Sequence, residues 1–443
     1  MRAGVGPEFC RRPRGVLRGA ALTLVFAGVI GTAAATGSLP RRPSAQEPPA
    51  AAGAGAGAEE ETGAAGFADR SPSSRTALGA AVVDPGTAAF GPIAPGPTPD
   101  STPVDRDALA RAAADAVADG KSGKQAAEEF VSRSGDRWSA VYDPREYAEF
   151  EQSLDGSYTG VGLSARRSGA DAVEISRVRP GGPADRAGLR AGDRITAVDG
   201  RPVAGRSVSE VVSLLRGEGV TGSTVTLGVV RDRVTWTRTL RRARLTTDPV
   251  TVRRLDDRAV LVRVTAFTKG TGERIRTAVR SAPAGTGILL DLRGNSGGLL
   301  AEARTAASAF LDGGLIATYD MDGTQHAVYA EGGGDTARPL VALVDGGTMS
   351  AAELLTGALK DRGRAVTVGS RTFGKGSVQM PSELPDGSVA EVTVGRYRTP
   401  AGHAVDGEGI TPDVLVRQAA GTRAERRAEE RARTVLSGLG GGS

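Results

Sequence analysis

The chain is poor in the side chains that most often carry chemistry in proteins. Its 443 residues include two histidines and one cysteine. Because a protein metal site usually takes about three or four ligands of these and acidic types, so small a supply offers no credible metal cluster. The lone Cys10 also excludes a disulfide within one chain. Since histidine is the commonest general base, an acid–base catalyst in this chain must be sought among other residues.

Lysine is scarce as well. Lysine and arginine together number 56. The lysines are Lys121, Lys124, Lys269, Lys360 and Lys375. Arginine stays protonated, with a pKa above ~12, whereas burial can bring a lysine from ~10.4 to near neutrality at a cost of about 4 kcal/mol. Lysine is therefore the only cationic residue type here that can serve as a general base.

A glycine-rich loop follows a predicted strand in the second half of the chain. The apolar run 288–292 reads as a buried strand, and the loop 294–298 (Gly-Asn-Ser-Gly-Gly) comes directly after it. Closely spaced glycines let backbone N–H groups converge on one point. Such a nest can hold a developing oxyanion.

Two further motifs place a serine and a lysine in special positions. After a predicted strand at 340–344, Ser350 should open a helix that runs to about residue 362 and has its positive end at the serine. Lys375 lies between two glycines, which leaves its amine accessible and its loop free to adopt positive φ. A serine at a helix start is usually only an N-cap, and Gly-Lys-Gly is usually a turn. The joint occurrence of the motifs is what predicts a nucleophile and a base.

In this order the motifs resemble those of the C-terminal processing peptidases, tail-specific serine proteases that use a Ser/Lys dyad. The resemblance covers roughly residues 103–418. It is carried by Asp-Leu-Arg-x-Asn-x-Gly-Gly at 291–298, Ser-Ala-Ala-Glu at 350–353, Gly-Lys-Gly-x-x-Gln at 374–379, and the closing motifs at 399–402 and 407–413. It implies an α/β protein whose core is a crotonase-like ββα superhelical serine protease, with an inserted PDZ domain and an N-terminal helical region.

The resemblance also assigns roles to individual residues. It implies that Ser350 is the nucleophile, that Lys375 is the general base and that Gln379 orients the lysine. It implies an oxyanion hole in which the N–H group of one residue, Ala351, joins that of a second. The second donor is Gly297 or Gly298. No cofactor and no metal is implied, and Asp291 with Arg293 is expected to be a structural ion pair.

Residues 158–245 resemble a PDZ domain. The resemblance rests on Gly160-Val161-Gly162-Leu163, a strand at 172–178 and the glycine-rich turns at 180–184 and 187–195. In that fold the loop before Gly162 presents N–H groups to a terminal carboxylate, the adjacent strand accepts a peptide by β-augmentation, and a helix at 208–215 forms the other wall. This implies protein substrates bound through their C-termini. The alternative is that these glycines only pack a sheet.

Other interpretations were weighed against this one. The loop around Ser296 resembles the nucleophile loop of trypsin-like proteases, but His326 and His403 both follow it, which is the wrong chain order. Both histidines are expected to be structural surface residues. A crotonase-like acyl-thioester enzyme is disfavoured by the PDZ pattern and the Ser/Lys pair. A PDZ-based binding scaffold, or an adaptor-gated protease with little intrinsic activity, stays the alternative function.

The first hundred residues predict export. Arginines precede an uncharged stretch within residues 1–40, which reads as a signal or a membrane anchor and places the catalytic domain outside the cytoplasm, tethered or secreted. Cys10 precedes this stretch and is not placed as a lipid attachment site. Residues 41–103, rich in Ala, Gly and Pro, predict a disordered linker.

The remaining boundaries follow from pattern. Residues 104–157 predict a helical region with Trp138 and its neighbouring aromatics in the core, and residues 246–420 predict the catalytic domain. The charged tail 421–443 predicts an exposed, solvated helix. The net charge of +5 is spread widely and suggests no nucleic-acid partner. Whether a homo-oligomer or an adaptor protein controls the activity stays open.

Overall fold

The computed structural model describes residues 23–24, 82–83, 104–168, 172–321, 323–416 and 422–440. The signal or anchor predicted at 1–40 and the linker predicted at 41–103 lie outside these ranges, apart from two short strands, β1 (Thr23–Leu24) and β2 (Val82–Val83). Within the described ranges, no helix has both the length and the apolar character that a membrane span requires. The fold is mixed α/β, as the sequence predicted, while the crotonase-like superhelix stays a prediction.

The N-terminal region is helical, and each helix begins at a polar cap. Its elements are α1 (Arg106–Ala118), α2 (Gly123–Ser134), β3 (Ala140–Tyr142) and α3 (Pro144–Leu154). The side chains of Asp105 and Ser122 accept backbone N–H groups at the first two helix starts, and Asp143 forms a capping box with Glu146 at the third. Strand β3 was not predicted. It pairs with a strand near the end of the chain, so this region forms part of the catalytic fold.

Residues 157–246 form a separate sheet with its own apolar core. The sheet order is β10-β9-β7-β6-β5-β2, with β8 beside β7. Its core includes Ile175, Val211 and Leu227. The elements are β5 (Leu163–Ser168), β6 (Ala172–Val178), α4 (Pro183–Arg186), β7 (Arg194–Val198), β8 (Arg201–Pro202), α5 (Val208–Arg216), β9 (Thr224–Arg231) and β10 (Val234–Arg241).

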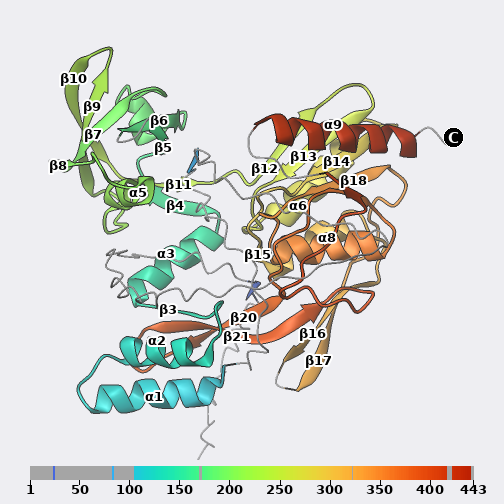
Figure 1. Ribbon diagram of the computed structural model, residues 1–443, viewed down its shortest axis with the longest axis horizontal. Helices are drawn as coiled ribbons and strands as arrows, with labels where there is room; N and C mark the ends of the chain where they lie inside the picture. Colours follow the sequence, from blue (N-terminus) through green and yellow to red (C-terminus); the bar gives the residue numbers. More distant parts are fainter. Residues whose placement is uncertain are drawn as a thin grey trace, which may run out of the picture. The chain divides into compact units, whose positions relative to one another are not determined.

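The chain enters and leaves this domain along one strand pair. Strands β4 (Ser157–Gly160) and β11 (Ala243–Thr246) are antiparallel, with Gly160 opposite Ala243 (Figure 1). Everything between them is therefore a closed insertion whose two ends lie side by side, as the predicted inserted domain requires.

The catalytic region is built on a six-stranded sheet with order β12-β13-β14-β18-β19-β22. All neighbours are parallel except β12 and β13. The strands are β12 (Val250–Arg254), β13 (Ala259–Val264), β14 (Gly287–Asp291), β18 (Leu340–Val344), β19 (Val366–Gly369) and β22 (Val414–Leu415). The central strands β14 and β18 are buried along their whole length because both faces of a parallel sheet are covered.

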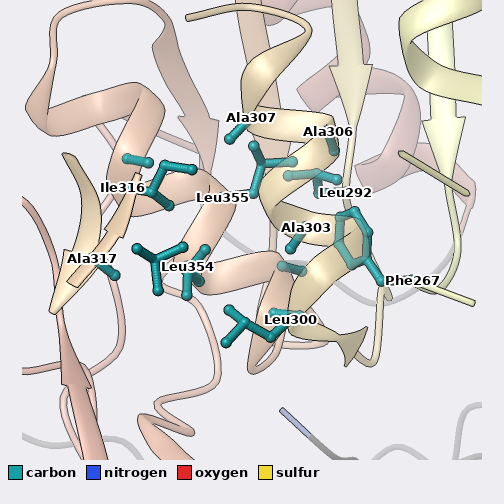
Figure 2. Packing of buried hydrophobic residues seen from close by; sticks show 14 of the residues in the cluster. Phe267, Leu292, Leu300, Ala303, Ala306, Ala307, Ile316, Ala317, Leu354 and Leu355 are labelled. Carbon is teal, nitrogen blue, oxygen red and sulfur yellow. The ribbon is translucent and has the colours of Figure 1, made fainter. Parts of the chain in front are cut away.

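Helices α6 (Thr271–Ser281), α7 (Leu300–Ser308) and α8 (Ala351–Asp361) contribute to the main core of this region. In Figure 2 the small side chains of α7, including Ala303 and Ala307, lie beside Leu354 and Leu355 of α8. Such small residues let two helices approach closely. The tight packing fixes α8, and with it the residue from which that helix begins.

The second sheet of the catalytic region has the order β15-β1-β20-β21-β16-β17, with β3 pairing β21. Its strands are β15 (Gly298–Leu299), β16 (Leu315–Met321), β17 (Thr324–Tyr329), β20 (Ser377–Glu383) and β21 (Val389–Arg398), together with β1 and β3. Strands β20 and β21 form a long hairpin that follows directly on the lysine motif.

The charged tail forms the predicted helix, but one face of this helix is buried and not solvated. Helix α9 (Thr422–Leu439) buries Ala428, Ala432 and Leu436 against the face of the parallel sheet that carries Leu289 and its neighbours (Figure 1). These small apolar residues recur every four positions among many arginines and glutamates. They form a narrow apolar stripe on one face of the helix, which the many charged residues around it made hard to recognise in the sequence.

Replacing Leu436 by alanine is therefore expected to lower the free energy of unfolding by about 2–4 kcal/mol, because Leu436 packs on β14 next to Gly287. Replacement of the exposed Arg431 by alanine is the control, with an expected change within about 0.5 kcal/mol. Urea unfolding of the whole chain measures both. Equal stabilities for the two variants would mean that α9 does not hold the sheet.

Candidate active site

The serine motif lies where two parallel strands end side by side. Strands β14 and β18 are neighbours, and the loops that follow them are joined through Asp345, whose Oδ1 accepts the N–H groups of Gly294 and Gly347, each at 2.9 Å. The hydroxyl of Thr348 donates to the carbonyl of Leu292 at 2.9 Å. The carboxyl ends of parallel strands are the usual place for a site in an open α/β sheet.

Ser350 is fully buried at the N-cap of α8 and has φ of +56° and ψ of −118°. Backbone with this combination is strained for any residue with a Cβ atom, and such strain is typical of functional positions. The hydroxyl-bearing Cβ is thereby held at the positive end of a helix, where developing negative charge is stabilised.

The glycine loop lies directly against the serine. A Cβ atom placed on Gly297, which has φ of +90°, would come within 2.9 Å of the Cβ of Ser350 and of the carbonyl oxygen of Met349. Only glycine therefore fits at this position. The structure thus brings the predicted oxyanion loop into contact with Ser350, which follows Gly297 by 53 positions in the sequence.

The oxyanion donors named from sequence are not equivalent. The N–H of Gly297 already donates to the side-chain Oδ1 of Asn295 at 2.8 Å. Hydrogen bonds to Phe267 use the carbonyl of Gly297 and the N–H of Leu299, so the N–H of Gly298 between them points to the opposite side. The N–H of Ala351, in the first turn of α8, has no acceptor among the described residues. Gly298 and Ala351 fit the role better than Gly297.

A buried glutamate connects the serine motif to the lysine motif. Glu353 is fully buried, and its Oε2 accepts the N–H groups of both Ser350 and Lys375 at 2.9 Å each. Its Oε1 accepts the hydroxyl of Thr372 at 2.5 Å and the N–H of Gly374 at 2.7 Å. Because both backbone nitrogens bind the same oxygen, Ser350 and Lys375 are held close together.

Burial is the main influence on the Glu353 carboxyl. Desolvation raises its pKa to about 7, although all four hydrogen bonds oppose that rise. Sequence reasoning assigned Glu353 no role. The available signal was the Ser-x-x-Glu spacing of a capping box, a local feature that does not predict contacts with a loop some twenty residues later.

Lys375 is fully buried, and burial lowers the pKa of its amine to about 7. Carboxylates of Asp136, Glu391, Asp406 and Glu353 act in the opposite direction, in that order. Because desolvation prevails, a large share of the amine is neutral near pH 7 and can accept a proton. The lysine loop is also fixed to the serine loop, since the N–H of Phe373 donates to the carbonyl of Thr348 at 3.0 Å.

Gln379 lies on β20 and is buried. Its amide nitrogen donates to the hydroxyls of Ser377 at 2.8 Å and Thr393 at 3.1 Å. Its Oε1 is buried and has no hydrogen-bond partner among the residues that the structure describes. The described bonds of Gln379 thus go to neighbours on its own sheet, and its orienting role toward Lys375 stays a prediction.

The residues predicted to bind a peptide terminus lie at the start of β5. Gly160 ends β4, Leu163 begins β5, and Val161 and Gly162 connect the two strands. The carbonyl of Gly162 accepts the N–H of Arg179, directly after β6, and that of Val161 accepts the N–H of Ala184 in α4, which holds this connection in place. Strand β2 pairs antiparallel with β5, so the edge of β5 can accept an extended chain.

The two histidines and Ser296 were weighed as catalytic residues of a trypsin-like site, and their surroundings are as follows. The ring of His326 stacks on Tyr319 at 5.2 Å, and His403 is exposed with its Nδ1 3.8 Å from Asp361. Ser296 is half-buried in the glycine loop. Asp291 and Arg293 form a buried ion pair at 2.7 Å. In the described part of the chain, no group of three or more His, Cys, Asp or Glu residues could hold a metal ion.

The chain is similar to known proteins in both of its main parts. Residues 258–416 match peptidase family S41, and residues 174–231 match the PDZ domain family. The chain is 38% identical over 300 residues to a chloroplastic C-terminal processing peptidase of Tetradesmus obliquus, covering 63% of this chain and 64% of that protein. It is 34% identical over 301 residues to a carboxyl-terminal-processing protease of Synechocystis sp., covering 66% of this chain and 70% of that protein.

A solved structure of a photosystem II D1 C-terminal processing protease is also similar. It shares 34% identity and a TM-score of 0.44 over 66% of this chain and 81% of the solved one. The matched part of the chain spans a little under two thirds of the length of the Tetradesmus relative. It spans a little over two thirds of the length of the Synechocystis relative.

Glu353→Gln is expected to destabilise the protein by about 2–4 kcal/mol. An amide oxygen can take the place of one carboxylate oxygen, but its NH2 group would face two backbone N–H donors and leave them without an acceptor. Thermal and urea unfolding measure the loss. The exposed Glu408→Gln is the matched control and should change stability by less than about 0.5 kcal/mol. A Glu353→Gln protein as stable as the control would contradict the four-bond role of this carboxylate.

Proposed function

Because the chain belongs to peptidase family S41, the serine-type family of the carboxyl-terminal-processing proteases, we propose that it is an endopeptidase that cleaves proteins near their C-termini. Ser350 is the nucleophile and Lys375 the general base. One observation carries this assignment: the backbone N–H groups of both residues bind the same oxygen of Glu353.

The chemistry proceeds in two steps. In acylation, the neutral amine of Lys375 takes the proton of the Ser350 hydroxyl while its oxygen adds to the scissile carbonyl carbon. The resulting oxyanion accepts the N–H groups of Gly298 and Ala351. The ammonium of Lys375 then gives its proton to the leaving amine, the C–N bond breaks, and an acyl-enzyme ester remains.

Deacylation repeats the same proton transfers with water. Lys375 takes a proton from a water molecule as its oxygen adds to the ester carbon, and then returns the proton to the Ser350 oxygen as the acyl group leaves as a carboxylic acid. The lowered pKa of Lys375, about 7, suits both directions, because the amine must accept and release a proton near neutral pH.

The substrate backbone is expected to bind as an extended strand between β15 and β20. This is supported by β1, whose Thr23 pairs antiparallel with Leu299 of β15 and with Gln379 of β20 (Figure 1). A chain in this position runs past Gly298, one of the two oxyanion donors. Pairing with backbone rather than with side chains is tolerant of substrate sequence.

The inserted PDZ domain supplies recognition of the substrate's C-terminal residues, with the connection from Gly160 to Leu163 as the carboxylate loop and α5 as the facing wall. Adaptor proteins or self-association as activators stay possible extensions of this proposal. The export pattern within residues 1–40 supports an extracytoplasmic location, either membrane-anchored or secreted.

The dyad is tested with residues 103–443 and an unfolded model protein that has an apolar C-terminus. Ser350→Ala and Lys375→Ala are each expected to lower kcat/KM by at least about a thousandfold. Ser296→Ala, in the neighbouring loop, is the control and should stay within a few-fold of the wild type. Loss of activity in Ser296→Ala alone would overturn the nucleophile assignment, and a wild type inert on every tail would favour the scaffold or the adaptor-gated alternative.

The pH dependence follows from the base. Only the neutral amine of Lys375 accepts the serine proton, and its pKa is about 7, so kcat/KM should rise with pH through this value and fall about tenfold for each pH unit below it. Initial rates between pH 5 and pH 9 measure this limb. A flat profile across that range would exclude Lys375 as the titrating base.

The role of the inserted domain is tested by removing it between β4 and β11. Gly160 lies opposite Ala243, so an Asn-Gly turn in place of residues 161–242 should close the two strands as a hairpin. The shortened enzyme is expected to lose its preference among C-terminal sequences. Unchanged rate and unchanged tail preference would show that the domain does not select substrates.

A further inference from the structure

The amine of Lys375 faces an aromatic ring that none of the catalytic motifs supplies. Its Nζ lies 5.0 Å from the centroid of the Trp138 ring, within cation–π range. Trp138 comes from the short segment between α2 and β3, more than two hundred residues before the lysine. Sequence reasoning had assigned this tryptophan to the apolar core.

The segment that carries Trp138 is firmly attached to the catalytic sheet. Asp136 accepts the N–H of Trp138 at 3.0 Å and the hydroxyl of Ser139 at 2.5 Å. The oxygen of Ser139 in turn accepts the N–H of Thr393 on β21 at 2.9 Å. Phe373, two residues before Lys375, packs edge-on against the indole at 5.7 Å. The Trp138 ring is therefore held in place by the bonds of its own segment to β21 and by its contact with Phe373.

Trp138 exerts two opposing influences on the lysine. The face of the ring attracts an ammonium ion, which favours the charged form. The bulk of the ring excludes water, which favours the neutral form. The pKa of the Lys375 amine is lowered from 10.5 to about 7, and burial is the largest cause. The exclusion of water therefore outweighs the attraction of the ring for the ammonium ion.

The charged groups around the amine cannot account for a neutral lysine. The carboxylates that face it are Asp136 from the Trp138 segment, Glu391 from β21, Asp406 from the loop after β21 and Glu353 from α8, and each favours the ammonium form. Arg137 lies over the Trp138 ring at 4.4 Å, but its side chain is exposed, so solvent screens its charge. Apolar cover is the remaining cause.

We propose that Trp138 is a positioning residue for the general base, whose indole ring keeps water from the amine of Lys375 and so holds that amine in its proton-accepting form. This rests on the proposed function of Lys375. The N-terminal helical region thereby contributes to catalysis and not only to the core.

The ring, and not its N–H group, performs this role. The Nε1 of Trp138 is buried and has no hydrogen-bond partner in the described residues. Phenylalanine keeps an aromatic cover, removes that unsatisfied donor and leaves a smaller ring in its place. Trp138→Phe is therefore the conservative variant that should preserve the effect, and Trp138→Ala the one that should abolish it.

The experiment measures the protonation of Lys375 directly, in the whole chain carrying Ser350→Ala. The protein is treated with a small amine-acylating reagent between pH 5 and pH 11, and the labelled fraction of Lys375 is followed by peptide mass spectrometry. The midpoint of the labelling curve reports protonation whatever the reagent's access. Exposed Lys121 is the internal reference, and Trp236→Ala, the chain's other tryptophan, is the control variant.

In the parent protein the midpoint for Lys375 is expected near 7. Trp138→Ala should raise it by at least about one pH unit, so that at pH 7 the unprotonated share of Lys375 falls from about one half to about one tenth, roughly fivefold. Trp138→Phe and Trp236→Ala should leave the midpoint within about 0.3 pH units, and Lys121 should not move in any variant. In the active enzyme, the acidic limb of kcat/KM should move upward by the same amount in Trp138→Ala and be restored in Trp138→Phe.

An unchanged midpoint in folded Trp138→Ala would overturn this inference. If thermal melting shows that this variant is not folded, Trp138→Leu takes its place. A smaller upward shift of the midpoint is then expected, and no shift would again overturn the inference. These outcomes are separate from the proposed function, because the labelling needs no activity. A moved midpoint together with full activity in Lys375→Ala would retain the role of Trp138 as a cover and reject Lys375 as the base.

Discussion

The carboxylate of Glu353 is the constraint on which the site depends. A buried carboxylate is unfavourable unless hydrogen bonds surround it, and this one accepts four, one from Ser350 and three from the loop that contains Lys375. They join Ser350, the N-cap residue of α8, to the loop before β20. The relative placement of Ser350 and Lys375 is therefore set by backbone atoms, which are fixed by the packing of α8, and only secondarily by side-chain rotamers. Pre-organisation of this kind favours the proton transfer that we propose between Ser350 and Lys375.

Much of this site was predictable because its parts are local. The strand followed by glycines at 294–298, the serine at a helix start and the lysine between glycines each have a physical signature within a few residues. The parallel order of β14 and β18 then brings the first two loops to one edge of the sheet. The inserted domain could equally be predicted from its glycine-rich turns. The choice between Gly297 and Gly298 as the proposed oxyanion donor could not be predicted, because it depends on the side chain of Asn295.

What sequence reasoning missed are contacts between distant segments. Glu353 looked like an ordinary capping residue, since nothing near it in the chain shows that Gly374 and Lys375 donate to the same carboxylate. Trp138 looked like a core residue, because its partner Lys375 lies on another element and β3 has too few residues to signal a strand. Helix α9 looked solvated because its charged positions outnumber its apolar stripe. Each error has the same origin: local pattern reports propensity, while these roles follow from tertiary packing.

The backbone of Ser350 also bears on how such a protein changes over evolutionary time. At φ of +56° and ψ of −118°, a serine is held in a conformation that glycine adopts without strain, at a cost on the order of 1–3 kcal/mol. A lineage released from the demand for a nucleophile would gain stability by drifting to glycine at this one codon. Selection for turnover and selection for foldedness thus act in opposite directions on residue 350, which makes its identity a record of which of the two has prevailed.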